Sequence, residues 1–177
     1  MKTLLYSLSL AAAATVCSGQ DYVGNLTPGQ EAANPGTRTG NGIFNMTLTG
    51  TTLNITGDFD GLSGTFRDAH IHAAALPGVN AGVLYSLASQ ITLSTDLKSG
   101  TINATVQLTD NANNRGFTVA QQLEQLNGGL WYFNIHSSTF TGGEIRGQIN
   151  PVPEPSTIAL GVLALGGLAL WRSRRRA

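Results

Sequence analysis

All three histidines of the chain fall in short segments with the pattern of β-strands. His70 and His72 are two residues apart in the segment 69–73, so strand alternation directs both imidazoles to one face while Ile71 points to the other. His136 ends another such segment. Imidazole nitrogens bind copper and zinc well, and two histidines on one strand face can reach a single ion. These residue types and their spacing indicate a possible copper or zinc site made of three histidines.

A polar stripe is expected beside the histidines, because polar and apolar residues alternate along the strand of His136 and along the next strand. If the loop 137–143 closes a symmetric hairpin, Asn134 pairs with Arg146 and His136 pairs with Glu144. The alternative to a metal site is a buried hydrogen-bonded network of these four residues with the other two histidines. Such a network would fix the strand register and would need no cofactor. The sequence leaves both alternatives open.

Short runs of alternating apolar and polar residues, rich in Thr and Asn, predict the strands that position these residues. The runs cover residues 21–26, 44–48, 53–59, 69–74, 83–88, 102–108, 130–136 and 144–149. The segment 119–126 differs, because its apolar residues repeat at helical spacing between a Thr118–Gln121 capping box and Gly128. We therefore predict an all-β fold, an antiparallel two-sheet sandwich with one short helix.

Residues 1–19 have the pattern of a secretory signal peptide, with one lysine followed by a short apolar run. This leaves one domain over residues 20–151, which contains no cysteine and therefore no disulfide. Five basic and nine acidic residues give this domain a formal charge of −4. A mildly acidic domain with few charges lacks the basic surface of a nucleic-acid-binding protein, so nucleic-acid partners are excluded.

Residues 152–177 combine three signals in order: the motif Pro153, Glu154 and Pro155, an uncharged apolar run over 158–171, and an arginine-rich end. The apolar run would form a short transmembrane helix of about 21 Å, against a hydrocarbon core of about 30 Å. The arginines should stay cytoplasmic, which leaves the domain outside. This tail resembles the PEP-CTERM sorting signal of Gram-negative bacteria. The resemblance implies an exosortase-type protease as a partner and membrane association before release to the cell surface or extracellular matrix; an ordinary membrane anchor is the alternative.

The domain itself resembles the CHRD family over about residues 22–149. The resemblance is carried by five blocks that occur in order: residues 61–64, 69–72, 78–82, 132–136 and 143–149. A weaker similarity is to copper/zinc superoxide dismutase, a Greek-key sandwich, and it rests on the His-x-His strand and the late strand that ends in histidine. On that similarity His70, His72 and His136 would be the copper-side ligands. The chain has no further histidine for a bridging ligand, so dismutase activity is not expected.

Taken together, these features predict an exported bacterial protein of the cell surface or extracellular matrix, with a binding or structural role rather than an enzymatic one. Extracellular polysaccharide or protein is the expected partner. The alternative function is a metal-binding, dismutase-like domain that uses His70, His72 and His136 with copper or zinc.

Overall fold

The structure is a computed structural model that describes residues 19–32 and 37–153. The predicted signal peptide, the predicted C-terminal hydrophobic helix, and Glu154 and Pro155 of the sorting motif lie outside these residues, whereas Pro153 lies within them. Among the residues described, no helix has the length and apolar character needed to cross a membrane.

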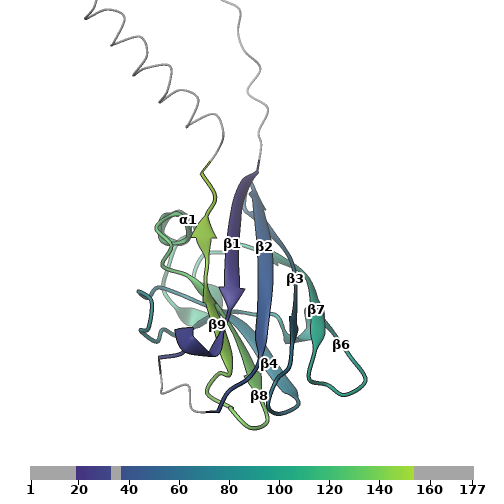
Figure 1. Cartoon of the computed structure of the whole chain (residues 1–177). Coiled ribbons are helices and arrows are strands. Elements are labelled where there is room, and N and C mark those ends of the chain that lie inside the picture. The colour runs from purple at the N-terminus through teal and green to yellow at the C-terminus, as the bar shows by residue number, and fades with distance from the viewer. Residues whose placement is uncertain (1–18, 33–36, 154–177) are drawn as a thin grey trace, which may run out of the picture.

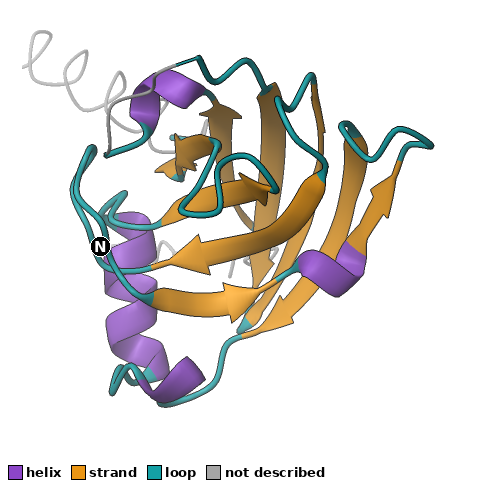
Figure 2. Cartoon of the chain, turned by 90° about the horizontal axis from the view of Figure 1, so that it is seen from below, coloured by secondary structure: helices purple, strands orange, loops and turns teal. Residues whose placement is uncertain are grey.

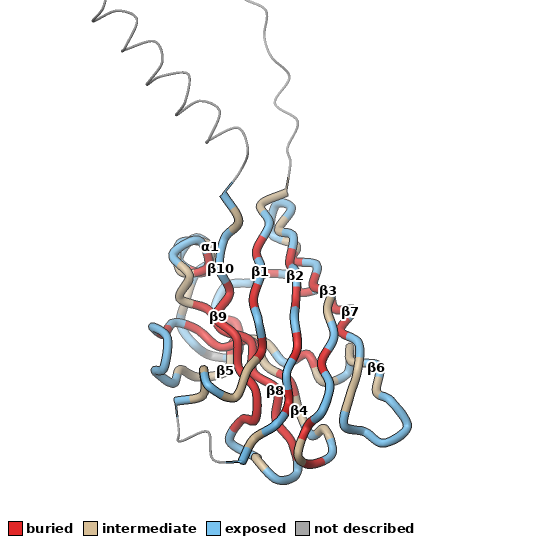
Figure 3. The backbone as a smooth tube through the Cα atoms, in the orientation of Figure 1, coloured by how far each residue is buried: buried red, intermediate tan, exposed pale blue. Residues whose placement is uncertain are grey.

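The larger sheet is antiparallel and has six strands in the order β10-β1-β2-β3-β7-β6. Its strands are β1 (Gln20–Leu26), β2 (Asn41–Thr49), β3 (Thr52–Asp60), β6 (Ile91–Leu93), β7 (Gly100–Gln107) and β10 (Asn150–Pro151). β10 lies beside the first of three consecutive strands, which is a Greek-key order. Buried and exposed residues alternate along β1, β2 and β7, so the sheet has one solvent face (Figure 3).

The smaller sheet has four antiparallel strands in the order β5-β4-β8-β9. They are β4 (Phe66–His72), β5 (Val83–Ser86), β8 (Tyr132–Ser137) and β9 (Ile145–Gln148). The two sheets form two layers, which Figures 1 and 2 show from the side and from below. The predicted all-β, two-sheet antiparallel sandwich is therefore confirmed.

The core lies between the sheets and is made of the apolar residues that point inward from each. From the smaller sheet these are Ala69, Ile71, Phe133, Ile135 and Ile145, and from the larger sheet Tyr22, Phe44, Met46, Leu53, Ile55, Phe59, Ile102 and Ala104. The sheets come closest at β1 and β9, where an added Cβ on Gly147 would lie 2.6 Å from the backbone oxygen of Asn25. This inward packing leaves the alternate residues of β4, β8 and β9 on the opposite face.

The short helix predicted within the domain is present as α1 (Val119–Asn127). The Thr118 side chain accepts a hydrogen bond from the backbone N–H of Gln121, and Oε1 of Gln121 accepts one from the backbone N–H of Thr118, so the predicted capping box is confirmed. The helix ends at Asn127, and the N–H of the C-cap residue Gly128 donates to the carbonyl of Glu124. The described residues also form short 3-10 turns at η1 (Pro28–Gln30), η2 (Ala88–Gln90) and η3 (Ala112–Asn114).

Several strand limits differ from the predicted ones. β4 begins three residues earlier than predicted and ends at His72, and β5 ends at Ser86 because η2 follows it. β8 begins at Tyr132 rather than at residue 130. β6 was not predicted, because a strand of three residues is too short to show an alternating pattern.

The outer face of the smaller sheet is covered by loops, so β8 and β9 are buried on both sides (Figure 3). The β4–β5 loop, residues 73–82, is held by Gln148, whose Nε2 donates to the carbonyl of Ala75. The segment before β2 is held by the paired backbone of Thr27 and Arg146 and by Gln30, whose Oε1 accepts from the backbone N–H of Gln148. The polar residues of this face therefore lie beneath a cover of loops rather than in solvent.

Candidate metal centre

β4 and β8 bring the three histidines together on the covered face of the smaller sheet. In the register of these strands His70 lies opposite Asn134, and Asp68 lies opposite His136. Because His72 is two residues beyond His70 on β4, its imidazole lies on the same face, as alternation predicts. The site is thus built on two neighbouring strands, which fixes the positions of its side chains more firmly than loops would.

One ring nitrogen from each of His70, His72 and His136 lies within 4.8 Å of the other two. The shortest approach is between Nδ1 of His70 and Nε2 of His136, at 3.1 Å. Zinc–imidazole bonds are about 2.0–2.1 Å long, so nitrogens that share one ion lie roughly 3.3–3.6 Å apart. A small movement of these rings would therefore bring all three nitrogens to bonding distance of a single ion.

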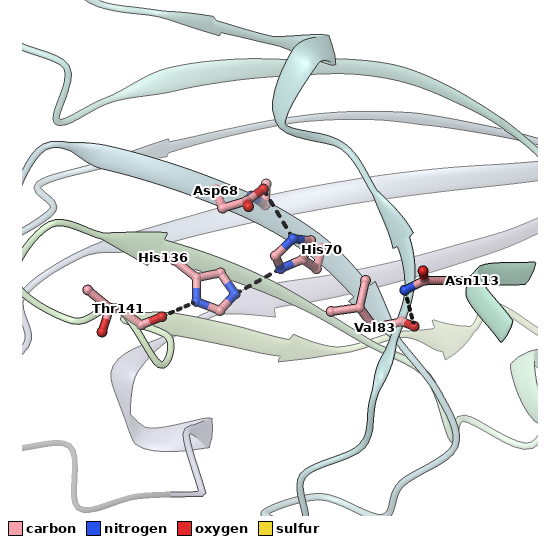
Figure 4. A network of polar contacts seen from close by, with 7 residues as sticks. Asp68, His70, Val83, Asn113, His136 and Thr141 are labelled. Carbon is pink, nitrogen blue, oxygen red and sulfur yellow. Dashed lines mark hydrogen bonds and ion pairs between the residues drawn. The ribbon is translucent and has the colours of Figure 1, made fainter. Parts of the chain in front are cut away.

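The second ring nitrogen of each histidine has its own acceptor, which fixes where the ring proton is. Nδ1 of His136 donates to the carbonyl of Thr141 at 3.0 Å, and Nδ1 of His72 donates to the carbonyl of Ala81 at 3.0 Å. Nε2 of His70 lies 3.1 Å from a carboxylate oxygen of Asp68, and Figure 4 shows the chain of contacts from Asp68 through His70 and His136 to Thr141. Because a carbonyl or carboxylate oxygen only accepts, these outer nitrogens carry the protons.

The nitrogens that face the centre of the cluster are consequently unprotonated in the neutral imidazoles. Nε2 of His72 is buried and has no hydrogen-bond partner. Nδ1 of His70 and Nε2 of His136 lie 3.1 Å apart, which is hydrogen-bond distance, and a proton on Nδ1 of His70 would join them. Three inward nitrogens, each on a ring whose outer nitrogen is held by an oxygen, form the arrangement that metal-binding histidines adopt.

Burial keeps His72 and His136 uncharged at neutral pH. His72 and His136 are 7 % and 9 % exposed. Burial, against a hydrogen bond to Ala81 that raises it and together with the positive charges of its neighbours, lowers the pKa of His72 to about 4. Burial also lowers the pKa of His136, against a hydrogen bond to Thr141 that raises it. Neutral imidazoles are the form that binds metal ions, so no proton has to leave the inward nitrogens of these two residues.

Tyr132 stands next to the cluster and connects it to Arg146. The rings of His72 and Tyr132 are stacked, with centroids 4.6 Å apart and an interplanar angle of 4°. The guanidinium carbon of Arg146 lies 3.4 Å from the centroid of the Tyr132 ring. Arg146 is 1 % exposed, and its nitrogens donate to the carbonyls of Val79 and Leu76 in the covering loop.

The residues predicted as a structural polar network lie in separate groups of contacts. Asn134 pairs with Arg146 in the ladder, as predicted, but the ladder ends at Ile135 and Ile145, one step short of the predicted His136–Glu144 pair. The buried Glu144 carboxylate instead accepts from the backbone N–H of Ser63 at 2.5 Å. Oδ1 of Asn134 and Nε of Arg146 are buried without a hydrogen-bond partner. Of these residues, His70 and His136 are the pair joined by a hydrogen bond between side chains.

Glu31 was not singled out in the sequence, and it lies beside this face. Burial raises the pKa of its carboxyl to about 7, although Arg38 and Arg146 lower it. A Cβ atom on Gly143 would lie 2.7 Å from Oε1 of Glu31 and 2.6 Å from Nδ2 of Asn134, and Gly143 has a φ of +126°. Only glycine fits this position, which gives a physical reason for the glycine in the sequence block 143–149.

Comparison with known proteins agrees with two of the resemblances seen in the sequence, those to the CHRD family and to the PEP-CTERM signal. The model of the CHRD domain matches residues 22–149, and the model of the PEP-CTERM protein-sorting motif matches residues 151–176. Neither model describes an enzyme. No curated protein and no solved structure matches the chain.

Proposed function

Because the chain belongs to the CHRD domain family and carries a PEP-CTERM sorting motif, we propose that it is a surface protein whose sandwich binds one copper or zinc ion. The sorting motif makes it an exported protein that passes through the membrane, is processed by an exosortase and is sorted to the cell surface. His70, His72 and His136 would hold the ion.

The observation that carries the proposal is the buried, unpartnered Nε2 of His72, which lies within 4.8 Å of one ring nitrogen each of His70 and His136. Each outer nitrogen is held by an oxygen acceptor, and the buried Nε2 of His72 has no donor near it. A network built only to fix strand register would be expected to place a donor at Nε2 of His72, because an unpaired buried acceptor costs about 1–3 kcal/mol. A metal ion at the centre would satisfy all three nitrogens at once.

Copper and zinc are the metals that suit this donor set. Three imidazoles without a thiolate or an inward carboxylate fit copper or zinc better than calcium or magnesium, which prefer oxygen. Asp68 would act behind His70, where a carboxylate orients the ring and makes it a better ligand. The proposed role is metal binding at the cell surface, and contact with a polysaccharide or another protein stays a prediction.

Metal loading of the full chain tests the proposal. The protein, purified in mild detergent with a chelator and then dialysed, is loaded separately with copper under reducing conditions and with zinc, and passed through a desalting column. Bound metal is measured by mass spectrometry. We expect about one ion per chain for copper, zinc or both. Retention of less than about 0.2 ions per chain for both metals would refute a three-histidine metal site.

A further inference from the structure

We propose that Arg146, acting through the Tyr132 ring, makes the three-histidine centre selective for monovalent copper, Cu(I), over divalent ions such as Zn(II). This inference rests on the proposed metal site and specifies the charge of the metal ion that the site binds most tightly. Arg146 would be a positioning residue, because its guanidinium faces Tyr132 rather than the cluster.

The first step is the order of the groups across the sheet. His72, Tyr132 and Arg146 come from the adjacent strands β4, β8 and β9. His72 is stacked on Tyr132 at 4.6 Å and nearly parallel, and the guanidinium carbon of Arg146 is 3.4 Å from the centroid of the same ring. Both groups cannot share one face of the ring at these distances, so they lie on opposite faces. The positive charge is therefore fixed behind a ligand of the cluster.

The second step is that the charge of Arg146 is buried and weakly compensated. Within the part of the chain that the structure describes, Arg146 forms no salt bridge, and its hydrogen bonds go to two carbonyls and to the side chain of Gln148. Glu31 acts on it electrostatically, but burial raises the pKa of Glu31 to about 7, so much of that carboxyl is protonated at neutral pH. The charge of Arg146 also contributes to the lowered pKa of His72.

The third step is that the ligands themselves carry no negative charge. The three ligands are imidazoles, and the negative charge of Asp68, which acts on His136 from behind His70, is the same with and without Arg146, so it leaves the effect of the Arg146 charge unchanged. A positive charge repels a divalent ion twice as strongly as a monovalent one. At a separation on the order of 10 Å and an effective dielectric constant of about 20, the difference is roughly ten- to twentyfold in relative affinity. Cu(I) also accepts three ligands without a fourth, whereas structural zinc sites are almost always four-coordinate.

A charge-matched pair of variants of the full chain tests this inference. Dissociation constants for Cu(I) and Zn(II) are measured by competition with chelators of known affinity, for the wild type, Arg146→Gln and Arg146→Lys. Circular dichroism checks that each variant folds. We expect Arg146→Gln to reduce the preference for Cu(I) over Zn(II) about tenfold or more, and Arg146→Lys to change it less than threefold. An unchanged preference in a folded Arg146→Gln variant would overturn the proposal.

A measurement on the wild type keeps the proposal testable if Arg146→Gln does not fold. One equivalent of Cu(I) is added without oxygen to the zinc-loaded chain, and zinc release is followed with a zinc-binding dye. We expect release of nearly all the zinc. Retention of zinc would overturn the preference for Cu(I) while leaving the metal site intact. Failure to load either metal would instead remove the proposed metal site itself, so the two failures are distinguishable.

Discussion

Replacing His70 with alanine is expected to weaken copper or zinc binding by at least a hundredfold. The change removes one of the three nitrogens that lie within 4.8 Å of one another. Removing a group that hydrogen-bonds to the outer nitrogen of a metal-binding histidine typically weakens metal binding by about 10–100-fold. Removing the histidine itself should weaken metal binding more. His70 suits the test because its side chain is the most exposed of the three, at 16 %, so its removal disturbs the fold least. The dissociation constant is measured by chelator competition.

Two companion variants make this prediction specific. Asp68→Ala removes the carboxylate that holds the outer nitrogen of His70, and it should weaken binding about 10–100-fold, less than the loss of His70 itself. Ser86→Ala is the control, because Ser86 lies opposite His70 in the β4–β5 ladder, is exposed and supplies no ring nitrogen. Equal affinities for His70→Ala and Ser86→Ala would contradict a role for His70 in binding.

Lowering the pH is expected to destabilise the metal-free Glu31→Gln variant markedly between pH 6.5 and pH 4. The pKa of His72 is about 4 in the folded protein and about 6.5 in the unfolded chain. Between these values the unfolded chain binds the proton and the folded protein does not, so stability falls as the pH falls. One such group can lower the free energy of unfolding by at most about 1.4 kcal/mol per pH unit, or about 3 kcal/mol between pH 6.5 and pH 4. The lowered pKa of His136 acts in the same direction.

The wild type should show a flatter profile because Glu31 has the opposite effect. Its pKa is raised to about 7, so the folded state binds more protons than the unfolded state above about pH 4.5, and stability falls as the pH rises towards 7. Urea unfolding of metal-free protein at several pH values measures both profiles. Adding His72→Phe to Glu31→Gln keeps an aromatic ring beside Tyr132 and should remove most of the slope. A slope that persists undiminished in the double variant would show that His72 is not its source.

Much of the fold could be predicted because its strands have one buried face. Alternation along the segments that became β1, β2, β3 and β7 gave their positions to within a few residues. Residues 66–68 at the start of β4 escaped this pattern, because the register shifts between Phe66 and Asp68 and interrupts the alternation. Strands β8 and β9 are buried on both faces because loops cover their outer face. The alternation of residues within a strand cannot predict that loops will cover it.

The sequence was sufficient to predict which residues form the candidate site. It was not sufficient to predict which ring nitrogen of each histidine carries the proton. The spacing of His70 and His72 and the position of His136 in a strand were sufficient to place three imidazoles on one face. The acceptors that decide which nitrogen carries the proton are the carbonyls of Ala81 and Thr141, which belong to loops. Any residue type supplies a carbonyl, so the sequence carries no signal for them. The same holds for Arg146, whose guanidinium reaches carbonyls of the covering loop.

X-ray absorption at the metal edge of the copper- or zinc-loaded full chain tests most directly that the three histidines bind one ion. The account predicts a first shell dominated by three nitrogens at about 2.0 Å, with the outer-shell scattering of imidazole rings, and loss of about one imidazole in His70→Ala. A first shell of oxygen ligands without imidazole scattering, or a spectrum that His70→Ala leaves unchanged, would contradict it.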